Sequence, residues 1–337
     1  MKKVIVTGGS GFIGTNLVNF LIRKKLFVIY IDKLTYSSNK YKDTIRNKFN
    51  YKFFKLDINN KKKLNALIKR HKPKAIFNLA AETHVDRSID GPKPFIHTNI
   101  NGTFNILECL RKFKKKTNIK LIHISTDEVY GDIKNNLRSN EKKNYEPSSP
   151  YSASKAAADH LVSSYIRTYK INAVISNCCN NYGPFQFPEK LIPLTITNIL
   201  RGKKIPIYGD GLNIRDWLFV EDHCGAIDII LNKAKPGSTY CIGGNNEIKN
   251  IDLVNQICVL IDEYAQKLNI VLSRNKSSDL ISYIDDRLGH DKRYAINSEK
   301  LLNEHNWKPK IKFEEGLKST VKWYLMNSSW WEPIIKN

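Results

Sequence analysis

The chain has 337 residues, of which 41% are hydrophobic, and its 55 lysines and arginines against 32 acidic residues give a formal net charge of +23. This length predicts one large domain or two interwoven domains. No stretch approaches the roughly 20 apolar residues of a membrane span, and the apolar run after Met1 is too short for a signal peptide. We therefore expect a soluble, cytoplasmic protein without a membrane partner.

The strong positive charge raises the question of nucleic-acid binding. The lysines, however, are scattered along the chain and are not gathered into one basic arm. We interpret most of this charge as solvated surface, part of which would steer a dianionic substrate toward its site. A protein that binds RNA through its basic surface is the alternative from a different class, and an unusually high, salt-dependent RNA affinity would favour it.

The cysteines lack the spacing of a metal site or a disulfide framework, because none belongs to a CxxC pair and two are adjacent. We expect no metal site and a set of buried, reduced thiols at Cys109, Cys178, Cys179, Cys224, Cys241 and Cys258.

The first half of the chain alternates short apolar runs with segments of helical periodicity. The apolar runs predict strands over residues 2–8, 26–32, 51–58, 74–81 and 120–126. Between them, apolar residues at helical spacing predict helices over residues 12–24, 61–71 and 101–113. Alternating strands and helices favour an α/β fold with a doubly wound parallel sheet.

The pattern changes after about residue 180, where prolines and aromatic residues gather in "NNYGPFQFPEKLIP". Residues 216–232 predict a short strand and then a helix with an acidic start that would return to the first half. Residues 249–266 predict an amphipathic helix capped by Asn250, and residues 297–327 predict two more helices. We expect a second, smaller lobe that is woven into the first.

The stretch "TGGSGFIG" follows the first strand and opens the first helix. Its Gly8, Gly11 and Gly14 would allow a tight turn and a close approach of the backbone to a pyrophosphate at the helix N-terminus. Asp32 ends the next strand, 18 residues after Gly14, where an acid bonds a ribose 2′-hydroxyl and repels a 2′-phosphate. The sequence therefore favours NAD over NADP, with a purely structural glycine turn as the alternative.

The stretch "YSASKAAADHLVSSY" places Tyr151 and Lys155 four residues apart, on one face of a predicted helix. A lysine beside a tyrosine favours the phenolate, so we expect Lys155 to lower the pKa of Tyr151. Such a tyrosine can take a proton from a sugar hydroxyl. A YxxxK pair alone is more often a surface pair, but this one follows a dinucleotide fingerprint.

Two adjacent acids, Asp127 and Glu128, stand in "STDEVYG" where the strand over 120–126 ends. They form either a solvated turn or an acid and a base that act on one substrate. Neighbours in a regular strand point to opposite faces. For both acids to reach one substrate, the backbone has to leave strand geometry near Asp127.

Taken together, these motifs resemble the nucleotide-sugar branch of the extended short-chain dehydrogenase/reductase family over almost the whole chain. The segments "NLAAETHVDRS", "STDEVYGD", "NNYGPFQFPEKLIP", "IRDWLFVEDH" and "DRLGHDKRYAI" resemble the 4,6-dehydratases of that family. Thr83 stands where serine is usual and Leu288 where proline is usual. The threonine puts in doubt how the sugar fits in the site. The leucine puts in doubt the geometry of its own loop.

The resemblance implies a Rossmann-type NAD-binding domain over residues 1–180, which the chain rejoins over about residues 216–240. It implies a nucleotide-sugar-binding lobe made mainly of residues 181–337. It implies a lyase that oxidises dTDP-glucose at C4, eliminates water across C5 and C6 and returns the hydride to C6. The product would feed deoxysugar biosynthesis, such as that of rhamnose. The alternative is another nucleotide-sugar 4,6-dehydratase or a 4-epimerase of the same fold, although an epimerase has no need of the acid pair.

The resemblance also implies the residue roles. Tyr151 would be the base for the C4 hydroxyl, Glu128 the base for the C5 proton and Asp127 the acid for the C6 hydroxyl. Thr126 would hydrogen-bond the C4 oxygen, and Lys155 the nicotinamide ribose. The protein would be a homodimer that pairs the helix around 100–113 and the helix from Tyr151 in a four-helix bundle.

The remaining contacts are implied in two groups. The cofactor would be lined, besides the three glycines, Tyr151 and Lys155, by Phe12, Ile13, Asp32, Lys33, Leu34, Thr35, Asp57, Ile58, Leu79, Ala80, Ala81, Thr98 and Asn181. The substrate would meet, besides Thr126, Thr83, Asn180, Lys190, Leu191, Pro206, Tyr208, Arg215, Asn250, Arg287 and His290. Lys190, Arg215 and Arg287 suit a diphosphate, or each is a surface or domain-contact charge.

Overall fold

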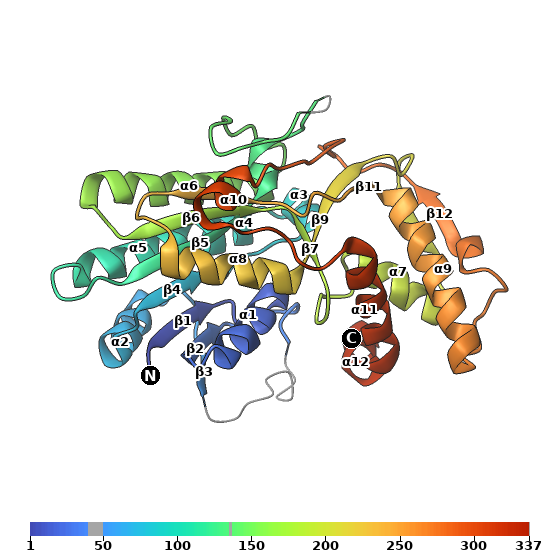
Figure 1. Cartoon of the computed structure of the whole chain (residues 1–337), viewed down its shortest axis with the longest axis horizontal. Helices are drawn as coiled ribbons and strands as arrows, with labels where there is room; N and C mark the ends of the chain where they lie inside the picture. Colours follow the sequence, from blue (N-terminus) through green and yellow to red (C-terminus); the bar gives the residue numbers. More distant parts are fainter. Residues whose placement is uncertain (40–49, 135–136, 337) are drawn as a thin grey trace.

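The computed structural model describes residues 1–39, 50–134 and 137–336. A large sheet with helices on both faces forms one part of the molecule, and a smaller group of helices and short strands lies beyond one end of it (Figure 1). No helix in these three ranges is long and apolar enough to cross a membrane.

The large sheet has seven parallel strands in the order β10-β6-β5-β4-β1-β2-β3. Its strands are β1 (Lys3–Thr7), β2 (Phe27–Asp32), β3 (Tyr51–Lys55), β4 (Ala75–Asn78), β5 (Lys120–Thr126), β6 (Ala173–Cys178) and β10 (Thr239–Ile242). Central strands such as β4 and β6 are buried at every position, as a parallel sheet covered on both faces requires. The five predicted strands of the first half are confirmed, whereas β6 and β10 were not predicted.

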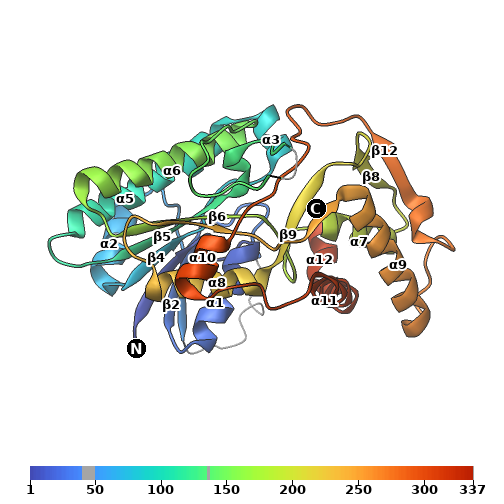
Figure 2. The ribbon, with the colours of Figure 1, turned by 45° about the horizontal axis from the view of Figure 1, so that its top comes forward.

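Helices cover both faces of this sheet, which confirms the doubly wound α/β fold (Figure 2). One face carries α1 (Phe12–Arg23) and α8 (Val220–Lys233), and the other α2 (Lys61–His71), α5 (Gly102–Phe113) and α6 (Pro150–Tyr169). The strands alternate between the two cores: Val4 and Val6 of β1 join the first and Ile5 joins the second. The predicted helices are confirmed, including the one that follows residue 216 and returns to the sheet.

Shorter elements surround the sheet. They are α3 (Val85–Asp90), α4 (Lys93–Phe95), the π-helix η2 (Ile96–Asn101), the 3-10 helix η3 (Asp127–Tyr130) and α10 (Glu299–His305). All six cysteines are buried and unpaired, as the sequence indicated.

The smaller part has its own apolar core. Its helices are α7 (Leu191–Leu200), α9 (Asn250–Leu268), η4 (Ser277–Leu280), α11 (Phe313–Met326) and α12 (Ser328–Lys336). Two small sheets join them: β7 (Asn180–Tyr182), β9 (Ile214–Phe219) and β11 (Glu247–Lys249) in one, and β8 (Ile205–Tyr208) with β12 (Ile281–Ile284) in the other.

One expectation about this part needs correction, and one helix was not predicted. Asn250 does not cap α9, because Lys249 occupies the N-cap and no side chain of the described residues makes a capping bond there. The two helices predicted over residues 297–327 are confirmed as α10 and α11. A third helix, α12, follows them and was not predicted; its Trp330 and Trp331 enter the core.

Candidate active site

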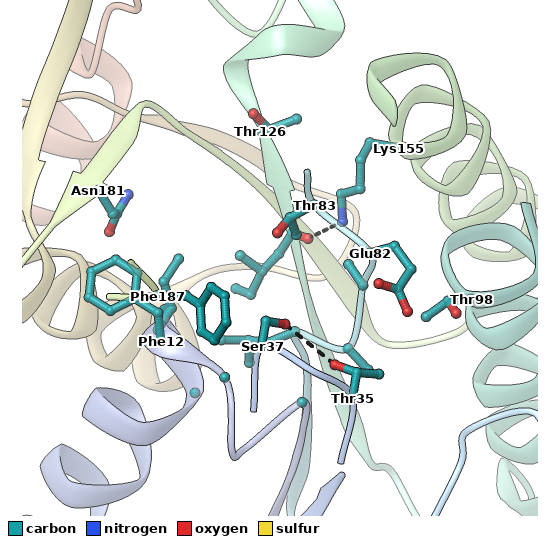
Figure 3. A pocket seen from close by; sticks show the side chains of 18 of the residues that line it. Phe12, Thr35, Ser37, Glu82, Thr83, Thr98, Thr126, Lys155, Asn181 and Phe187 are labelled. Carbon is teal, nitrogen blue, oxygen red and sulfur yellow. Dashed lines mark hydrogen bonds between the residues drawn. The ribbon is translucent and has the colours of Figure 1, made fainter. Parts of the chain in front are cut away.

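A pocket of about 290 Å³ lies at the carboxyl ends of the parallel strands, where the smaller part meets the sheet (Figure 3). In doubly wound folds this edge is where ligands bind. Among the described residues, every predicted cofactor residue except Leu34 lines the pocket, as do the five predicted catalytic residues. The sequence motifs that lie far apart in the chain therefore meet at one place.

The glycine-rich turn forms the floor of this pocket between β1 and α1. Gly8 has a φ of +66°, and a Cβ there would lie 2.8 Å from the backbone of Ala80. A Cβ on Gly14 would lie 2.1 Å from the carbonyl oxygen of Gly8. Gly11 is the N-cap of α1, and no side chain among the described residues caps this helix. The backbone N–H groups of the first turn of α1 are therefore not capped by a side chain, and the glycines allow an anionic group to approach them closely.

Asp32 at the end of β2 stands beside this turn. Its carboxylate accepts hydrogen bonds from the Ser10 backbone N–H at 3.0 Å, the Leu34 N–H at 2.7 Å and the Ser38 hydroxyl at 3.1 Å. Burial raises the pKa of Asp32, and these hydrogen bonds oppose that rise. Leu34 therefore contributes its backbone to holding Asp32, although its side chain does not line the pocket.

The acid pair stands where β5 gives way to η3. Strand geometry ends at Thr126, and the 3-10 helix begins at Asp127, so the predicted break in the strand is confirmed. Thr126 fixes the break, because its hydroxyl accepts the Glu128 N–H at 3.3 Å and donates to Asp127 Oδ1 at 3.3 Å. Both carboxyl groups line the pocket, which excludes the solvated turn.

The two acids differ in their surroundings. Asp127 is 3% exposed, and its Oδ2 has no hydrogen-bond partner among the described residues. Burial, and then the charge of Glu128, raise the pKa of Asp127 well above its usual range. Burial also raises the pKa of Glu128, but the positive charges of Arg287, Arg215 and Lys190 oppose it. Asp127 is accordingly suited to hold a proton near neutral pH and Glu128 to accept one.

Tyr151 and Lys155 lie on the first two turns of α6, which starts with a Ser149–Ser152 capping box. Tyr151 is 7% and Lys155 5% exposed. Lys155 Nζ donates a 2.6 Å hydrogen bond to the carbonyl of Ile124 (Figure 3). Burial raises the pKa of Tyr151 well above its usual value, with the charge of Glu128 next in importance. The expected lowering of the Tyr151 pKa is thus wrong for this arrangement, because desolvation of the phenol dominates and Lys155 is not among the main influences on it.

The predicted substrate residues fall into two groups. Thr83, Thr126, Asn180 and Lys190 line the pocket. The others lie outside its described lining: Leu191, Pro206, Tyr208, Arg215, Asn250, Arg287 and His290.

Several members of the second group nevertheless approach the site from the smaller part. Arg287 lies 3.5 Å from Asp86 of α3, and the Tyr208 hydroxyl donates to the same carboxylate at 3.1 Å. Arg215 donates to the carbonyls of Ile214 and Asp291 at 2.8 and 2.9 Å. Because the charges of Arg215 and Arg287 act on Glu128, these cations belong to the electrostatic surroundings of the pocket.

Sequence reasoning missed some of the pocket wall: Ile31, Ser37, Ser38, Leu56, Glu82, Ile124, Ser125, Cys178, Cys179, Gln186, Phe187 and Glu189. Many of them flank predicted strand ends, so the rule that ligands bind at the carboxyl edge could have found them. Phe187 and Glu189 come from an irregular segment with no such signal.

The fold and the pocket together define a Rossmann-type protein whose site lies where this fold binds dinucleotides. A family model described as GDP-mannose 4,6 dehydratase matches residues 5–320. The chain belongs to this family of nucleotide-sugar-modifying short-chain dehydrogenase/reductase proteins, as its motifs indicated.

Individual relatives are similar over the full length. The chain is 47% identical to "Probable dTDP-glucose 4,6-dehydratase" of Sinorhizobium fredii, over 98% of this chain and 95% of the relative. A crystal structure of dTDP-glucose 4,6-dehydratase from Bacillus anthracis in complex with NAD has a TM-score of 0.87 and 45% identity, covering 99% and 100% of the two chains. The UDP-glucose 4-epimerase of Thermus thermophilus, also with NAD, has a TM-score of 0.84 but 26% identity, covering 96% and 99%.

Proposed function

We propose that this protein is an NAD-dependent lyase that converts dTDP-glucose into its 4-keto-6-deoxy derivative. The observation that carries the proposal is the acid pair, a buried Asp127 and a partly buried Glu128. It lies in the same pocket as Tyr151, Lys155 and the glycine-rich turn. The full-length similarity to dTDP-glucose 4,6-dehydratases supports the same conclusion.

The residues present fit NAD. The crowding at Gly8 and Gly14 leaves room only for a bare backbone, which suits a pyrophosphate at the uncapped start of α1. Asp32 suits a ribose hydroxyl and opposes a 2′-phosphate. Lys155 and Tyr151 lie farther along the same pocket, where they would meet the nicotinamide ribose and the reacting sugar. When bound, NAD supplies the acceptor for the C4 hydrogen and the donor that returns it to C6.

The reaction explains why two acids are needed. The C5 hydrogen of glucose becomes acidic only after C4 is a ketone, so a base has to act first at the C4 hydroxyl. Tyr151 would act in that step, and it lines the same pocket as Thr126. Thr126 opposes the effect of burial on the Tyr151 pKa. Glu128 then removes the C5 proton, and Asp127 gives a proton to the departing C6 hydroxyl.

The nucleotide diphosphate would lie toward the smaller part. Arg287 Nε and Asn250 Oδ1 are buried and have no hydrogen-bond partner among the described residues. Buried polar groups are normally paired, so each of these atoms is available to a ligand. Arg287, Arg215 and Lys190 would then serve both the diphosphate and the ionised form of Glu128.

Incubation of the purified protein with dTDP-glucose tests this function. We expect the 4-keto product without any added oxidant or reductant, because the hydride stays within one turnover. UDP-glucose, which differs in the nucleotide base, and GDP-mannose, which differs in both base and sugar, are the comparison substrates. Formation of the C4 epimer of UDP-glucose in place of a keto sugar would show an epimerase, and no conversion of any of the three would contradict the proposal.

Three parts of the proposal concern the whole protein. The return of α8 and β10 to the large sheet supports an NAD-binding domain of residues 1–180 plus about 216–240, with 181–337 mainly binding the nucleotide sugar.

Ile96 and Phe104 are 45% and 41% exposed on η2 and α5, which supports a homodimer through α5 and α6. The unpaired cysteines support a reducing, cytoplasmic location.

A further inference from the structure

Three segments that are far apart in the sequence meet on one side of the pocket. Residues 33–38 follow β2, residues 82–87 come after β4, and residues 186–190 come after β7. Each contributes to the pocket wall, for example through Ser37, Glu82 and Phe187 (Figure 3). Contacts among these segments therefore hold this side of the pocket together.

Tyr36 stands between the other two segments. Its ring meets Phe187 edge-on, with the ring centroids 5.5 Å apart. The Arg87 guanidinium lies over the ring, 3.8 Å from its centroid, close enough for a cation–π contact. The Tyr36 hydroxyl donates a hydrogen bond to Glu189 Oε1 at 3.2 Å. One side chain thus links all three segments.

Glu189 completes this arrangement from the segment after β7. Its side chain is 15% exposed, and its Oε2 lies 3.8 Å from Arg87 Nε and 3.6 Å from His84 Nε2. Burial, and then the charge of Lys190, lower the pKa of His84 to about 4. His84 is therefore neutral at pH 7, and the cations that act on Glu189 are Lys190 and then Arg87.

A second hydrogen bond joins two of the same segments. Lys190 Nζ donates a hydrogen bond to the carbonyl oxygen of Thr83 at 2.9 Å, and Thr83 lines the pocket next to Glu82. The Arg87 side chain itself is 56% exposed. The contacts thus lie at the rim, where water can compete for the charged groups and allow occasional opening.

We propose that Tyr36, Arg87 and Glu189 form a clamp that retains the bound cofactor. This inference rests on the proposed function, in which each turnover regenerates NAD and gives no reason to release it. None of the three belongs to the five predicted catalytic residues, and we assign them a positioning role. Opening the clamp is needed only when the cofactor first enters.

Exchange of bound NAD for isotopically labelled NAD, without any sugar substrate, tests the clamp. Glu189→Gln keeps the shape but removes the charge that Tyr36 and Arg87 face. We expect release to be about tenfold faster, the size that loss of one hydrogen bond to a charged group gives. Tyr36→Phe removes only the hydroxyl and should accelerate release by a smaller factor.

Glu221→Gln is the matched control. Glu221 pairs with Arg23 at 2.6 Å on the exposed surface between α8 and α1, outside the set of described residues that line the pocket. Its exchange rate should equal that of the wild type. Unfolding temperatures of all variants, measured after removal of NAD, separate faster release from a general loss of structure, because weaker NAD binding would itself lower the values measured with NAD present.

The outcomes separate the clamp from the function on which it rests. Faster exchange in Glu189→Gln and Tyr36→Phe at unchanged unfolding temperature supports the clamp. Exchange rates equal to the wild type in both variants would overturn it, even when the enzyme remains active. A wild-type protein that retains no NAD at all would instead contradict the proposed function.

Discussion

The hydroxyl of Ser125, near the end of β5, donates a 2.7 Å hydrogen bond to the buried carboxylate of Asp159 on α6. Tyr145 and Asn177 donate to the same oxygen at 3.0 and 3.2 Å. Asn177 also donates to the carbonyl of Thr126 at 3.2 Å. One carboxylate thus joins the tips of β5 and β6 to the helix that carries the YxxxK pair.

Removal of this carboxylate should weaken the fold measurably. Asp159→Ala leaves the buried donors of Ser125, Tyr145 and Asn177 without their acceptor, and each such group costs about 1–3 kcal/mol. We expect the free energy of unfolding in urea to fall by roughly 3 kcal/mol or more. Ser125→Ala, which removes a single donor, is the control and should cost about 1 kcal/mol. Equal losses in the two variants would show that the network adds nothing beyond one bond.

Asp32 should control which cofactor is retained. Asp32→Ala removes the carboxylate that would bond the ribose hydroxyl, a charge-assisted bond worth about 1.5–3 kcal/mol. We expect the purified variant to retain at least tenfold less NAD, measured in the supernatant after denaturation and with the wild type as reference. Its preference for NAD over NADP should also fall, because the charge that repels a 2′-phosphate is gone. NADP as the main nucleotide in the wild-type protein would contradict this role.

The strands of the first half could be predicted because they are continuous apolar runs, which a parallel sheet buries on both faces. β6 was missed because its sequence, "AVISNC", interrupts the apolar run with Ser176 and Asn177. The fold buries both of these polar residues, and Asn177 is satisfied partly by Asp159, a partner that is distant in the chain.

The candidate site could be predicted where its residues form local motifs, as in the glycine turn and in Asp127–Glu128. Contacts between loops carry no local pattern, which is why Tyr36 and Glu189 were missed. The direction of the Tyr151 pKa was wrong for a related reason. The sequence shows that Lys155 is near in the chain, but it does not show how completely the phenol is buried.

The raised pKa of Asp127 should make stability depend on pH. A carboxyl whose pKa is raised by folding contributes its full stability below the unfolded value of 3.8, and this contribution is lost as the pH rises through the folded value. Asp127→Asn cannot ionise, so we expect it to be more stable than the wild type at pH 7. The difference in unfolding temperature should shrink toward zero below about pH 4.

Thermal unfolding across this pH range, with the exposed Asp90→Asn as control, measures that dependence. The control should show no comparable gain at pH 7. A variant at Asp127 that is less stable than the wild type at pH 7, with the difference vanishing below about pH 4, would mean that the carboxyl is held as the anion. In that case it could not serve as the acid of the elimination.

The acid pair and Tyr151 should fail at different steps when they are changed one at a time. Tyr151→Phe removes the group that we propose as the base for the C4 hydroxyl, so dTDP-glucose should produce little reduced cofactor. Asp127→Asn and Glu128→Gln leave that base in place. In both, the absorbance of reduced cofactor should rise in a single turnover while overall product formation falls.

Loss of one general acid or base typically slows a step by about 10²–10⁴-fold, roughly 3–5 kcal/mol of barrier. The two acid variants should also differ from each other, because the proposed mechanism assigns removal of the C5 proton to Glu128 alone. Deuterium at C5 should wash out faster in Asp127→Asn, which retains that base, than in Glu128→Gln. Near-normal turnover in both acid variants would mean that the pair takes no part in the elimination, despite its burial in the pocket.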